Sequence, residues 1–507
     1  MSESSYGGCG ARTMSGSGRM RYSASVVLTR LGPAGIEVFL VERSPKLRFL
    51  GGYWSLPGGV IDEVDGGFAE PARACALREL FEETGVTTPE LASRLGEEGR
   101  DLARDQALVR DGVASRFVDA LRQAPTALDR LEELGSITTP PFGPRRYANR
   151  FYHLECPPAE WPTVREGELV DGRFLSPGNA LRLWMEDELR IAPPVLLVLE
   201  LLDRHGPRGF YAAMRNETAE LEAGKLHPAS FSPGILVFPL RTETIPPATT
   251  TNCYVVGHRN LYVIDPASPY EDEQVRLFAK LDELLAEGRQ LDGIIATHHH
   301  PDHVGAIVPA AQRYGVPVFA HEITLSRLPG GDYEKRALVD SQRLALGHAP
   351  DGAENWELVA HHTPGHDRGH LAFVETRYRA AIVGDLASTV STIVIDPPEG
   401  HLRTYLDSLR RMLGLDFDLL YPAHGPATRD GRELLRDYLN HRVAREAQLL
   451  EGLKQASKLE DLVPLVYHDV DPAMHAFAAR SLLAGLEKLA EDGRALRHGE
   501  DWRLAVS

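Results

Sequence analysis

The segment THHHPDHVG, residues 297–305, places four histidines and an aspartate within six positions, directly after the apolar run GIIA. Imidazole and carboxylate groups are the usual protein ligands for zinc and related divalent ions. A single histidine is more often a surface residue or a hydrogen-bonded core residue, so one alone would indicate little. This cluster follows a strand-like run, and open α/β sheets bind their ligands at the carboxyl ends of strands. The segment therefore predicts an α/β fold that holds metal on the loop after a strand.

Three more strand-like segments in the second half of the chain lead to a residue of the same chemical type. ELVA precedes HHTPGH, AAIVGD ends in an aspartate, and LLYPAHG carries another histidine. The residues that these segments supply are His366, Asp385 and His424. Chance is a poor explanation for so many ligand-type side chains that each follow an apolar strand. We expect them to complete the metal site.

The order HxHxDH, His, Asp, His resembles the metallo-β-lactamase fold, a four-layer αββα hydrolase scaffold with a two-metal site. The resemblance implies two zinc ions, or iron or manganese in their place. It assigns His298, His300 and His366 to one ion, Asp302, His303 and His424 to the other, and Asp385 to a bridging position. Asp302 is also expected to orient the attacking water, and Asp265, at the end of the LYVID strand, to orient the site. His362 remains a rival to His366 as a ligand.

Two metal ions can activate water and polarise a carbonyl or phosphoryl oxygen, but they do not choose the electrophile. Thioesters, lactams, lactones and phosphodiesters all suit such a site. THHHPDHVGA looks close to the glyoxalase II thioesterases, whereas HTPGHDRGH through NHRVAREAQLLEGL is more similar to the β-lactamase-like protein 2 group. Animal members of that group cleave single-stranded RNA, and fungal relatives release polyketides from carrier-protein thioesters. The C-terminal stretch looks like the group's winged-helix appendage, with few basic residues on its expected helix, HAFAARSLLAGLEKLAEDG.

An acidic helix in the first half of the chain carries a second candidate site. AEPARACALRELFEETGV has helical apolar spacing, with Pro71 near its start and Gly85 as its stop. Glu79, Glu82 and Glu83 stand at i, i+3 and i+4, so a helix points all three carboxylates the same way, within reach of one or two hard cations. For an isolated pair of glutamates the alternative is a solvated acidic stripe. The surrounding residues decide between these two interpretations.

Pro57-Gly58-Gly59 before the helix, together with RELFEETGV from Arg78 to Val86, resembles the Nudix box. Proteins with this box bind magnesium or manganese and hydrolyse nucleoside diphosphates linked to another group. The resemblance implies an α/β/α sandwich in which Glu79, Glu82 and Glu83 bind the ions, Arg78 orients these glutamates, and Glu82 is a candidate general base. Eleven positions separate Gly59 from Glu70 where the family has six, so five residues within VIDEVDGGFA are inserted in the loop.

Residues upstream of the box look like the extra signature of Nudix hydrolases that act on coenzyme A. Arg43, Arg48, Gly58 and Gly59 are the substrate-binding residues that this likeness implies. Beyond the box, PRRYANRFYHL and FLSPGNAL resemble the second half of the larger proteins of that group. The resemblance thus spans residues 21–205, with residues 91–139 as a helical insertion.

A chain of 507 residues exceeds what one hydrophobic core usually supports, so several domains are expected. The expected parts are a flexible tail (1–20), a Nudix domain (21–205), a linker (206–235), a metallo-β-lactamase-fold domain (236–435) and a helical, winged-helix-like domain (436–507). Four scattered cysteines argue against a disulfide framework, and no apolar run resembles a signal peptide or a membrane span. We therefore expect a cytoplasmic protein without a membrane partner.

The formal net charge of −17 argues against broad, sequence-independent binding of nucleic acid and favours a small-molecule substrate. The leading hypothesis is a bifunctional hydrolase of coenzyme A derivatives, in which the second domain cleaves an acyl thioester and the Nudix domain cleaves the pyrophosphate. The alternative is an RNA-processing enzyme that joins a single-stranded endoribonuclease to a Nudix 5′-end or cap diphosphatase. A third hypothesis is that one domain is catalytically silent and serves as a binding module.

Overall fold

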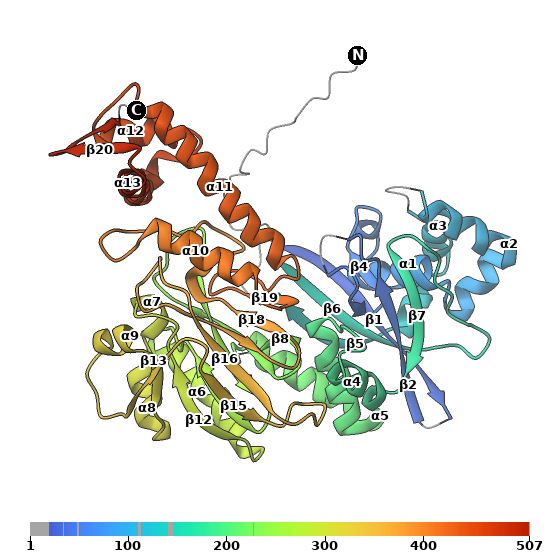
Figure 1. Ribbon diagram of the computed structural model, residues 1–507. Coiled ribbons are helices and arrows are strands. Elements are labelled where there is room, and N and C mark those ends of the chain that lie inside the picture. The colour runs from blue at the N-terminus through green and yellow to red at the C-terminus, as the bar shows by residue number, and fades with distance from the viewer. Residues whose placement is uncertain are drawn as a thin grey trace. The chain divides into compact units, whose positions relative to one another are not determined.

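The computed structural model describes residues 20–505, apart from residues 34, 48–49, 110–112, 140–145 and 227. The expected tail thus lies almost entirely outside the described residues. The chain forms two compact units that divide near Phe238 and Pro239. In Figure 1 the colour runs from blue and green in the first unit to yellow, orange and red in the second. Each unit has its own sheet or sheets and its own hydrophobic cores.

A seven-stranded sheet forms the centre of the first unit. Strands β3, β2, β1, β6 and β5 lie in that order, while β4 pairs with β1 and β7 pairs with β2. The strands are β1 (Arg21–Gly32), β2 (Gly35–Arg43), β3 (Trp54–Ser55), β4 (Gly58–Val60), β5 (Glu132–Thr138), β6 (Tyr147–Glu155) and β7 (Leu169–Leu175). β1 and β2 form an antiparallel hairpin with Gly32 opposite Gly35.

Helices cover both faces of this sheet, because successive side chains of a strand point to opposite sides. Ala24, Val26 and Leu28 of β1 pack in one core with α1, whereas Val27 packs in a second core with α5. The helices are α1 (Pro71–Thr84), α2 (Pro89–Ala107), α3 (Ser115–Gln123), α4 (Pro177–Met185) and α5 (Pro193–Glu222), with 3-10 turns η1 (Asp65–Gly67) and η2 (Pro125–Arg130). Helices α1, α2 and α3 contribute to the first core, and α4 and α5 contribute to the second. This is the expected α/β/α sandwich.

A helix lies in the expected linker, and a strand lies in the expected helical insertion. The expected linker, residues 206–235, contains the second half of α5, which restarts after a break at Gly206, where φ is 63°. Pro207 suits the first turn after the break, because a helix makes no use of the N–H groups there. The expected helical insertion, residues 91–139, is helical at first but ends in the edge strand β5.

Two sheets with helices on their outer sides form the sandwich that carries the candidate metal ligands (Figure 1). One sheet has the order β14-β13-β12-β11-β10-β9-β8, and the other has the order β15-β16-β17-β18-β19. The strands of the first sheet are β8 (Ala229–Ser232), β9 (Ile235–Arg241), β10 (Thr250–Gly257), β11 (Asn260–Ile264), β12 (Gln290–Ile295), β13 (Val318–His321) and β14 (Lys335–Leu338). Those of the second are β15 (Arg343–Gly347), β16 (Trp356–His362), β17 (Leu371–Glu375), β18 (Ala380–Ile382) and β19 (Leu419–Tyr421).

The helices of this sandwich are α6 (Glu271–Ala286), α7 (Pro301–Val304), α8 (Ile307–Tyr314), α9 (Glu322–Arg327) and α10 (Leu402–Leu413), with the 3-10 turn η3 (Gly384–Leu386). Helix α8 contacts β12, and α10 shares a core with β17 and β18. The layers are those of the expected αββα scaffold. Strands β18 and β19 are parallel, so their carboxyl ends lie at the same edge of the sheet. Asp385 and His424 follow those two ends.

The C-terminal part is helical and ends in a short hairpin, as expected. It comprises α11 (Gly431–Gly452), α12 (Leu459–Val466), the 3-10 turn η4 (Pro472–Met474), α13 (His475–Glu491), β20 (Ala495–His498) and β21 (Asp501–Leu504). Helix α11 crosses the expected domain boundary at residues 435–436, because its first half packs in one hydrophobic core and its second half in another. Leu435 and Tyr438 pack with α10, whereas Leu449 packs with α12 and α13. Within the described residues, every helix is too short or too polar to traverse a lipid bilayer.

Candidate metal centres

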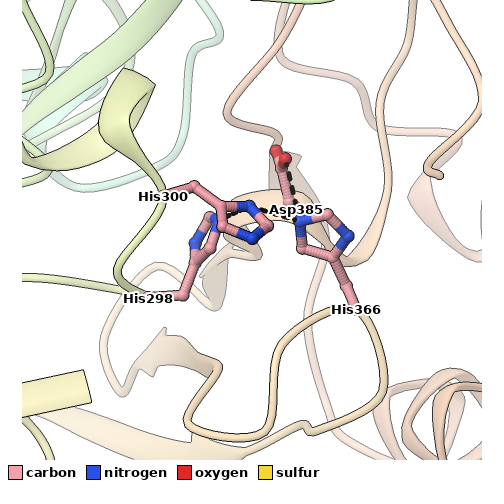
Figure 2. Close-up of side chains that lie close together, drawn as sticks. All are labelled: His298, His300, His366 and Asp385. Carbon is pink, nitrogen blue, oxygen red and sulfur yellow. Dashed lines mark hydrogen bonds and ion pairs between the residues drawn. The ribbon is translucent and has the colours of Figure 1, made fainter. Parts of the chain in front are cut away.

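Loops after several strands of the second unit bring the predicted ligands together. The loop after β12 carries His298 and His300, the loop after β16 carries His366, and η3 after β18 carries Asp385. Figure 2 shows these four side chains pointing toward one another. One ligand atom of each lies within 4.8 Å of the ligand atoms of the other three. Positions that are far apart in sequence therefore form one compact donor set.

The nitrogen atoms of this set have the spacing of a shared ion. His298 Nε2 lies 3.0 Å from His300 Nδ1, which lies 3.0 Å from His366 Nε2. Three nitrogens at ordinary zinc bond lengths in a tetrahedral arrangement would be about 3.3 Å apart. Asp385 Oδ2 lies 3.5 Å from His366 Nε2 and adds an oxygen donor.

A second donor set consists of Asp302, His303 and His424, whose ligand atoms also lie within 4.8 Å of one another. His424 Nε2 is 3.7 Å from Asp302 Oδ2. Asp385 turns its other oxygen to this set, with Oδ1 3.3 Å from His424 Nε2 and 3.6 Å from His303 Nε2. Asp385 thus lies between the two sets, as the bridging assignment requires.

Outer hydrogen bonds fix how four of the histidines face the site. In each of them Nδ1 makes a hydrogen bond outside the cluster, so Nε2 is left to face the cluster. The partners are Thr297 Oγ1 for His298, Asp265 Oδ2 for His303, the Val394 carbonyl for His366 and the Thr250 carbonyl for His424, at 2.8–3.0 Å. Such partners select the tautomer and raise the basicity of a metal-binding imidazole.

Asp265 connects several of these groups. Its Oδ1 accepts from the Thr297 N–H at 2.7 Å, and its Oδ2 accepts from Thr297 Oγ1 at 2.7 Å and from His303 at 2.8 Å. Asp265 is buried and adopts a positive φ of 49°, which is unusual for a residue other than glycine. The structure therefore gives this aspartate the contacts of an orienting residue, in line with the sequence interpretation.

The electrostatics of the first donor set suit a cation. Burial and the neighbouring His366 lower the pKa of His300 to about 4, and burial with His303 lowers the pKa of His298 well below its ordinary value. Neutral imidazoles of this kind are the form that binds metal. Burial alone would raise the pKa of Asp385. The neighbouring His424 and His303 lower it more strongly and hold it well below its usual range. A carboxylate therefore persists between the two sets.

Two buried atoms at the centre lack hydrogen-bond partners in the described part of the chain: His303 Nε2 and Asp385 Oδ1. Leaving such atoms buried and unpaired is costly unless something else binds them. The two atoms lie 3.6 Å from each other, which is beyond hydrogen-bond distance. The donor chemistry, the spacing and these unpaired atoms fit two divalent cations.

The remaining histidines of the region have other partners. His299 Nδ1 lies 2.5 Å from the buried carboxylate of Asp367. His362, the rival ligand, donates from Nε2 to the Arg368 carbonyl at 2.9 Å and belongs to none of the ligand groups found among the described residues. His370 Nε2 accepts the Asp385 N–H at 3.1 Å and belongs to neither donor set.

The acidic helix of the first unit forms as predicted, as α1 from Pro71 to Thr84, and Gly85 ends it in the left-handed conformation. Arg78 holds two of the predicted ligands, since Nη1 donates to Glu79 Oε1 at 2.9 Å and to Glu82 Oε2 at 3.0 Å. Glu82 Oε1 also accepts the Ala114 N–H at 2.8 Å. Arg78 thus contacts two of the three glutamates, and its orienting role stays a prediction.

The two glycines before the helix, Gly58 and Gly59, lie against the carboxylates of Glu83 and Glu79. The Gly58 N–H donates to Glu83 Oε2 at 2.9 Å. At Gly59 a Cβ atom would lie 2.4 Å from the Glu79 carboxylate, so any other residue would displace that side chain. Burial raises the pKa of Glu79 to about 7 and that of Glu83 well above its ordinary value. These three carboxylates do not form one of the tight ligand groups found among the described residues, all of which lie in the second unit.

Asp65 is a functional candidate that the sequence analysis missed. It is 1% exposed, and its carboxylate receives two hydrogen bonds from Arg78, from Nε at 3.0 Å and from Nη2 at 2.8 Å. Glu70, which the sequence comparison placed in the box, instead forms an exposed pair with Arg73. The signal was available, because Asp65 stands six positions after Gly59, the spacing of the family pattern. The inserted residues therefore follow Asp65.

The predicted substrate-binding arginines are less well defined. Arg43 ends β2, and its positive charge acts to lower the pKa of Glu83, so it lies near the acidic helix. Arg48 lies outside the described residues.

Comparison with known families matches three parts of the chain. Residues 20–129 match the NUDIX domain, residues 246–424 the metallo-beta-lactamase superfamily, and residues 459–502 the beta-lactamase associated winged helix domain.

Curated relatives cover about half of the chain. A beta-lactamase-like protein 2 homolog from Caenorhabditis elegans is 27% identical, over 48% of this chain and 79% of its own. An atrochrysone carboxyl ACP thioesterase from Aspergillus novofumigatus is 29% identical, over 48% of this chain and 74% of its own. Among solved structures, a beta-lactamase domain protein from Burkholderia ambifaria is 20% identical, over 56% of this chain and 94% of its own, with a TM-score of 0.48. The chain is a hydrolase that joins a NUDIX domain to a metallo-beta-lactamase superfamily domain and its associated winged helix domain.

Proposed function

We propose that the chain is a bifunctional metal-dependent hydrolase. The metallo-beta-lactamase domain hydrolyses a thioester or a related ester, and the NUDIX domain cleaves a diphosphate-linked metabolite, with coenzyme A or an acyl-coenzyme A as the favoured substrate. The observation that carries the proposal is the pair of donor sets around Asp385, in which His303 Nε2 and Asp385 Oδ1 are buried without a hydrogen-bond partner among the described residues.

In the second domain the histidines act as metal ligands and Asp302 orients the attacking water. When bound, two divalent ions would polarise the scissile carbonyl and lower the pKa of the attacking water. His298 and His366 are held by outer hydrogen bonds, so they need little reorganisation to act as ligands. Asp302 is a member of the second donor set, and we expect its carboxylate also to orient the attacking water.

In the NUDIX domain, Glu79, Glu82 and Glu83 would hold magnesium or manganese, hard cations that prefer carboxylate oxygens. Arg78 and the Gly58 N–H fix the directions of these carboxylates. Glu82 remains the candidate base, held between Arg78 and the Ala114 N–H. Arg43 lies near this helix as a partner for an anionic substrate.

Thioester chemistry is favoured over RNA cleavage for two reasons. One curated relative is named as a carrier-protein thioesterase. In addition, the basic residues of α13, the expected recognition helix of the winged-helix part, form intramolecular ion pairs. Arg480 pairs with Asp396, and Lys488 pairs with Glu446 and Asp492. Paired cations of this kind contribute less to phosphate binding than free ones.

The test is product analysis by mass spectrometry after the full chain is incubated with acyl-coenzyme A, zinc and magnesium. The wild-type protein should release free coenzyme A and phosphopantetheine products. His298→Ala should reduce thioester hydrolysis at least about 100-fold, since even the loss of an outer partner of a ligand costs 10- to 100-fold. Glu82→Gln should abolish only the pyrophosphate cleavage.

His362→Ala is the matched control, because this histidine lies near the site but outside the donor sets. It should leave both reactions unchanged. Single-stranded RNA is incubated in parallel. If acyl-coenzyme A stays intact while RNA is cut in a His298-dependent way, the second domain is a nuclease and the proposal is wrong.

A further inference from the structure

A segment without regular structure connects the candidate ligands of the second domain. Residues 386–395, here called the bridging segment, follow directly after Asp385. Ser388 Oγ donates to the His424 carbonyl at 3.1 Å, and the Val394 carbonyl accepts from His366 Nδ1 at 2.8 Å. One stretch of backbone thus contacts or adjoins three ligands that belong to both donor sets.

Two side chains of α11 hold this segment. Tyr438 Oη accepts the Ser388 N–H at 3.0 Å and lies 2.7 Å from the Ser391 carbonyl, to which it donates. One helical turn later, Arg442 donates to the Ile393 carbonyl, next to the Val394 carbonyl that binds His366. Both side chains are 7% exposed, so these contacts are shielded from water.

Arg442 also reaches the site by a second route. Its guanidinium lies 5.6 Å from the centre of the Tyr405 ring. Tyr405 Oη donates to the Leu386 carbonyl at 2.8 Å, and Leu386 is the residue after Asp385. The two ends of the bridging segment are therefore both connected to α11.

These contacts replace the partners that a sheet would provide. The bridging segment forms neither helix nor strand after η3, and Ser388 and Ile393 are buried. Buried N–H and C=O groups need hydrogen-bond partners, and side chains must supply them where the backbone does not pair. Tyr438 and Arg442 supply several of these partners, beside the bonds that the segment makes to His424 and His366.

We propose that Tyr438 and Arg442 are positioning residues for the two-metal centre, and that α11 thereby couples the C-terminal helices to the site. The inference rests on the two-metal centre proposed above. The second half of α11 packs with α12 and α13, and Ser481 of α13 accepts the Ile395 N–H at 3.3 Å. The winged-helix part thus supports the geometry of the site.

The test compares Tyr438→Phe with Tyr314→Phe in the full chain. Tyr314 is the control, because its hydroxyl also makes hydrogen bonds within the second domain, to the Phe278 carbonyl and to Asp282, but to no residue of a ligand loop. Zinc affinity is measured by competition with a chromophoric chelator, and the visible spectrum of the cobalt-substituted protein reports ligand geometry. Urea unfolding is measured alongside.

Tyr438→Phe should weaken zinc binding about 10-fold and change the cobalt spectrum, as expected for loss of an outer partner. Tyr314→Phe should leave both readouts as in the wild type. Tyr405→Phe tests the second route and should also weaken binding, so the proposal remains testable if Tyr438→Phe does not fold.

If Tyr438→Phe and Tyr405→Phe bind zinc as tightly as the wild type, with an unchanged cobalt spectrum, the positioning role is overturned while the metal centre stands. A wild-type protein that binds no zinc would overturn both this inference and the proposed function.

Discussion

Asp65 and Arg78 form a buried ion pair at the base of the acidic helix, with both side chains almost without exposure. The third nitrogen of the Arg78 guanidinium, Nη1, donates to Glu79 and Glu82. Asp65 therefore holds the guanidinium in the position from which it binds these two candidate ligands. A buried charge that loses its partner is costly, because water cannot replace the lost contact.

We expect Asp65→Asn to lower the free energy of unfolding of the NUDIX domain by about 3 kcal/mol, and to reduce pyrophosphate cleavage. Glu70→Gln is the control, because its carboxylate is 58% exposed and an exposed pair contributes only about 0–1 kcal/mol. Urea unfolding and the coenzyme A assay measure both effects. Equal, small losses in the two variants would show that Asp65 does not have this role.

At this scale the structure brings together the candidate ligands of the second domain more closely than those of the first. The residues from His298 to His424 could be singled out because they follow apolar strands in a fixed order. Asp65 was missed because Glu70 was taken as the acidic residue of the box, although Asp65 has the family's spacing of six positions after Gly59. The outer partners Val394 and Thr250 act through backbone carbonyls, which every residue has, so no side-chain pattern could mark them.

At the scale of elements, the strands and the long helices follow from apolar periodicity, but α5 does not. Its second half contains Gly206 and Pro207, residues that commonly end a helix. The helix restarts because its buried residues Phe210 and Met214 pack in the core beneath the sheet. Tertiary packing here outweighs local propensity.

His153 connects this part of α5 to the sheet. Its Nε2 lies 2.7 Å from Thr29 Oγ1 of β1, and its Nδ1 lies 2.6 Å from Tyr211 Oη of α5. Burial lowers the pKa of His153 to about 4. The folded protein therefore keeps a neutral ring that is satisfied on both sides.

Stability should depend on pH through this residue. In the unfolded chain the ring titrates near its ordinary pKa of about 6.5, so the unfolded state binds the proton first as pH falls. His153 thus contributes stability above pH 6.5 that is lost as the pH falls toward 4, by at most about 1.4 kcal/mol per pH unit. Urea unfolding at pH 7 and pH 5 should show a smaller pH effect in His153→Gln than in the wild type. An identical pH effect in both would contradict this account.

At the scale of the whole molecule, each compact unit has its own core and its own set of candidate ligands. The sequence predicted this division into two hydrolase domains and the layers of each fold. It could not predict the substrates, because specificity depends on loops whose conformations are set by tertiary contacts. The bridging segment illustrates this, since its path depends on Tyr438 and Arg442, which lie far along the chain.

The central claim is that the second domain holds two ions around Asp385. The most direct measurement is the metal content of the full chain by inductively coupled plasma mass spectrometry, after zinc loading and gel filtration. The wild-type protein and His362→Ala should each retain two more zinc ions than a variant in which His298, Asp385 and His424 are all replaced by alanine. If the wild-type protein retains no more zinc than the triple variant, these residues do not form a metal centre and the account is wrong.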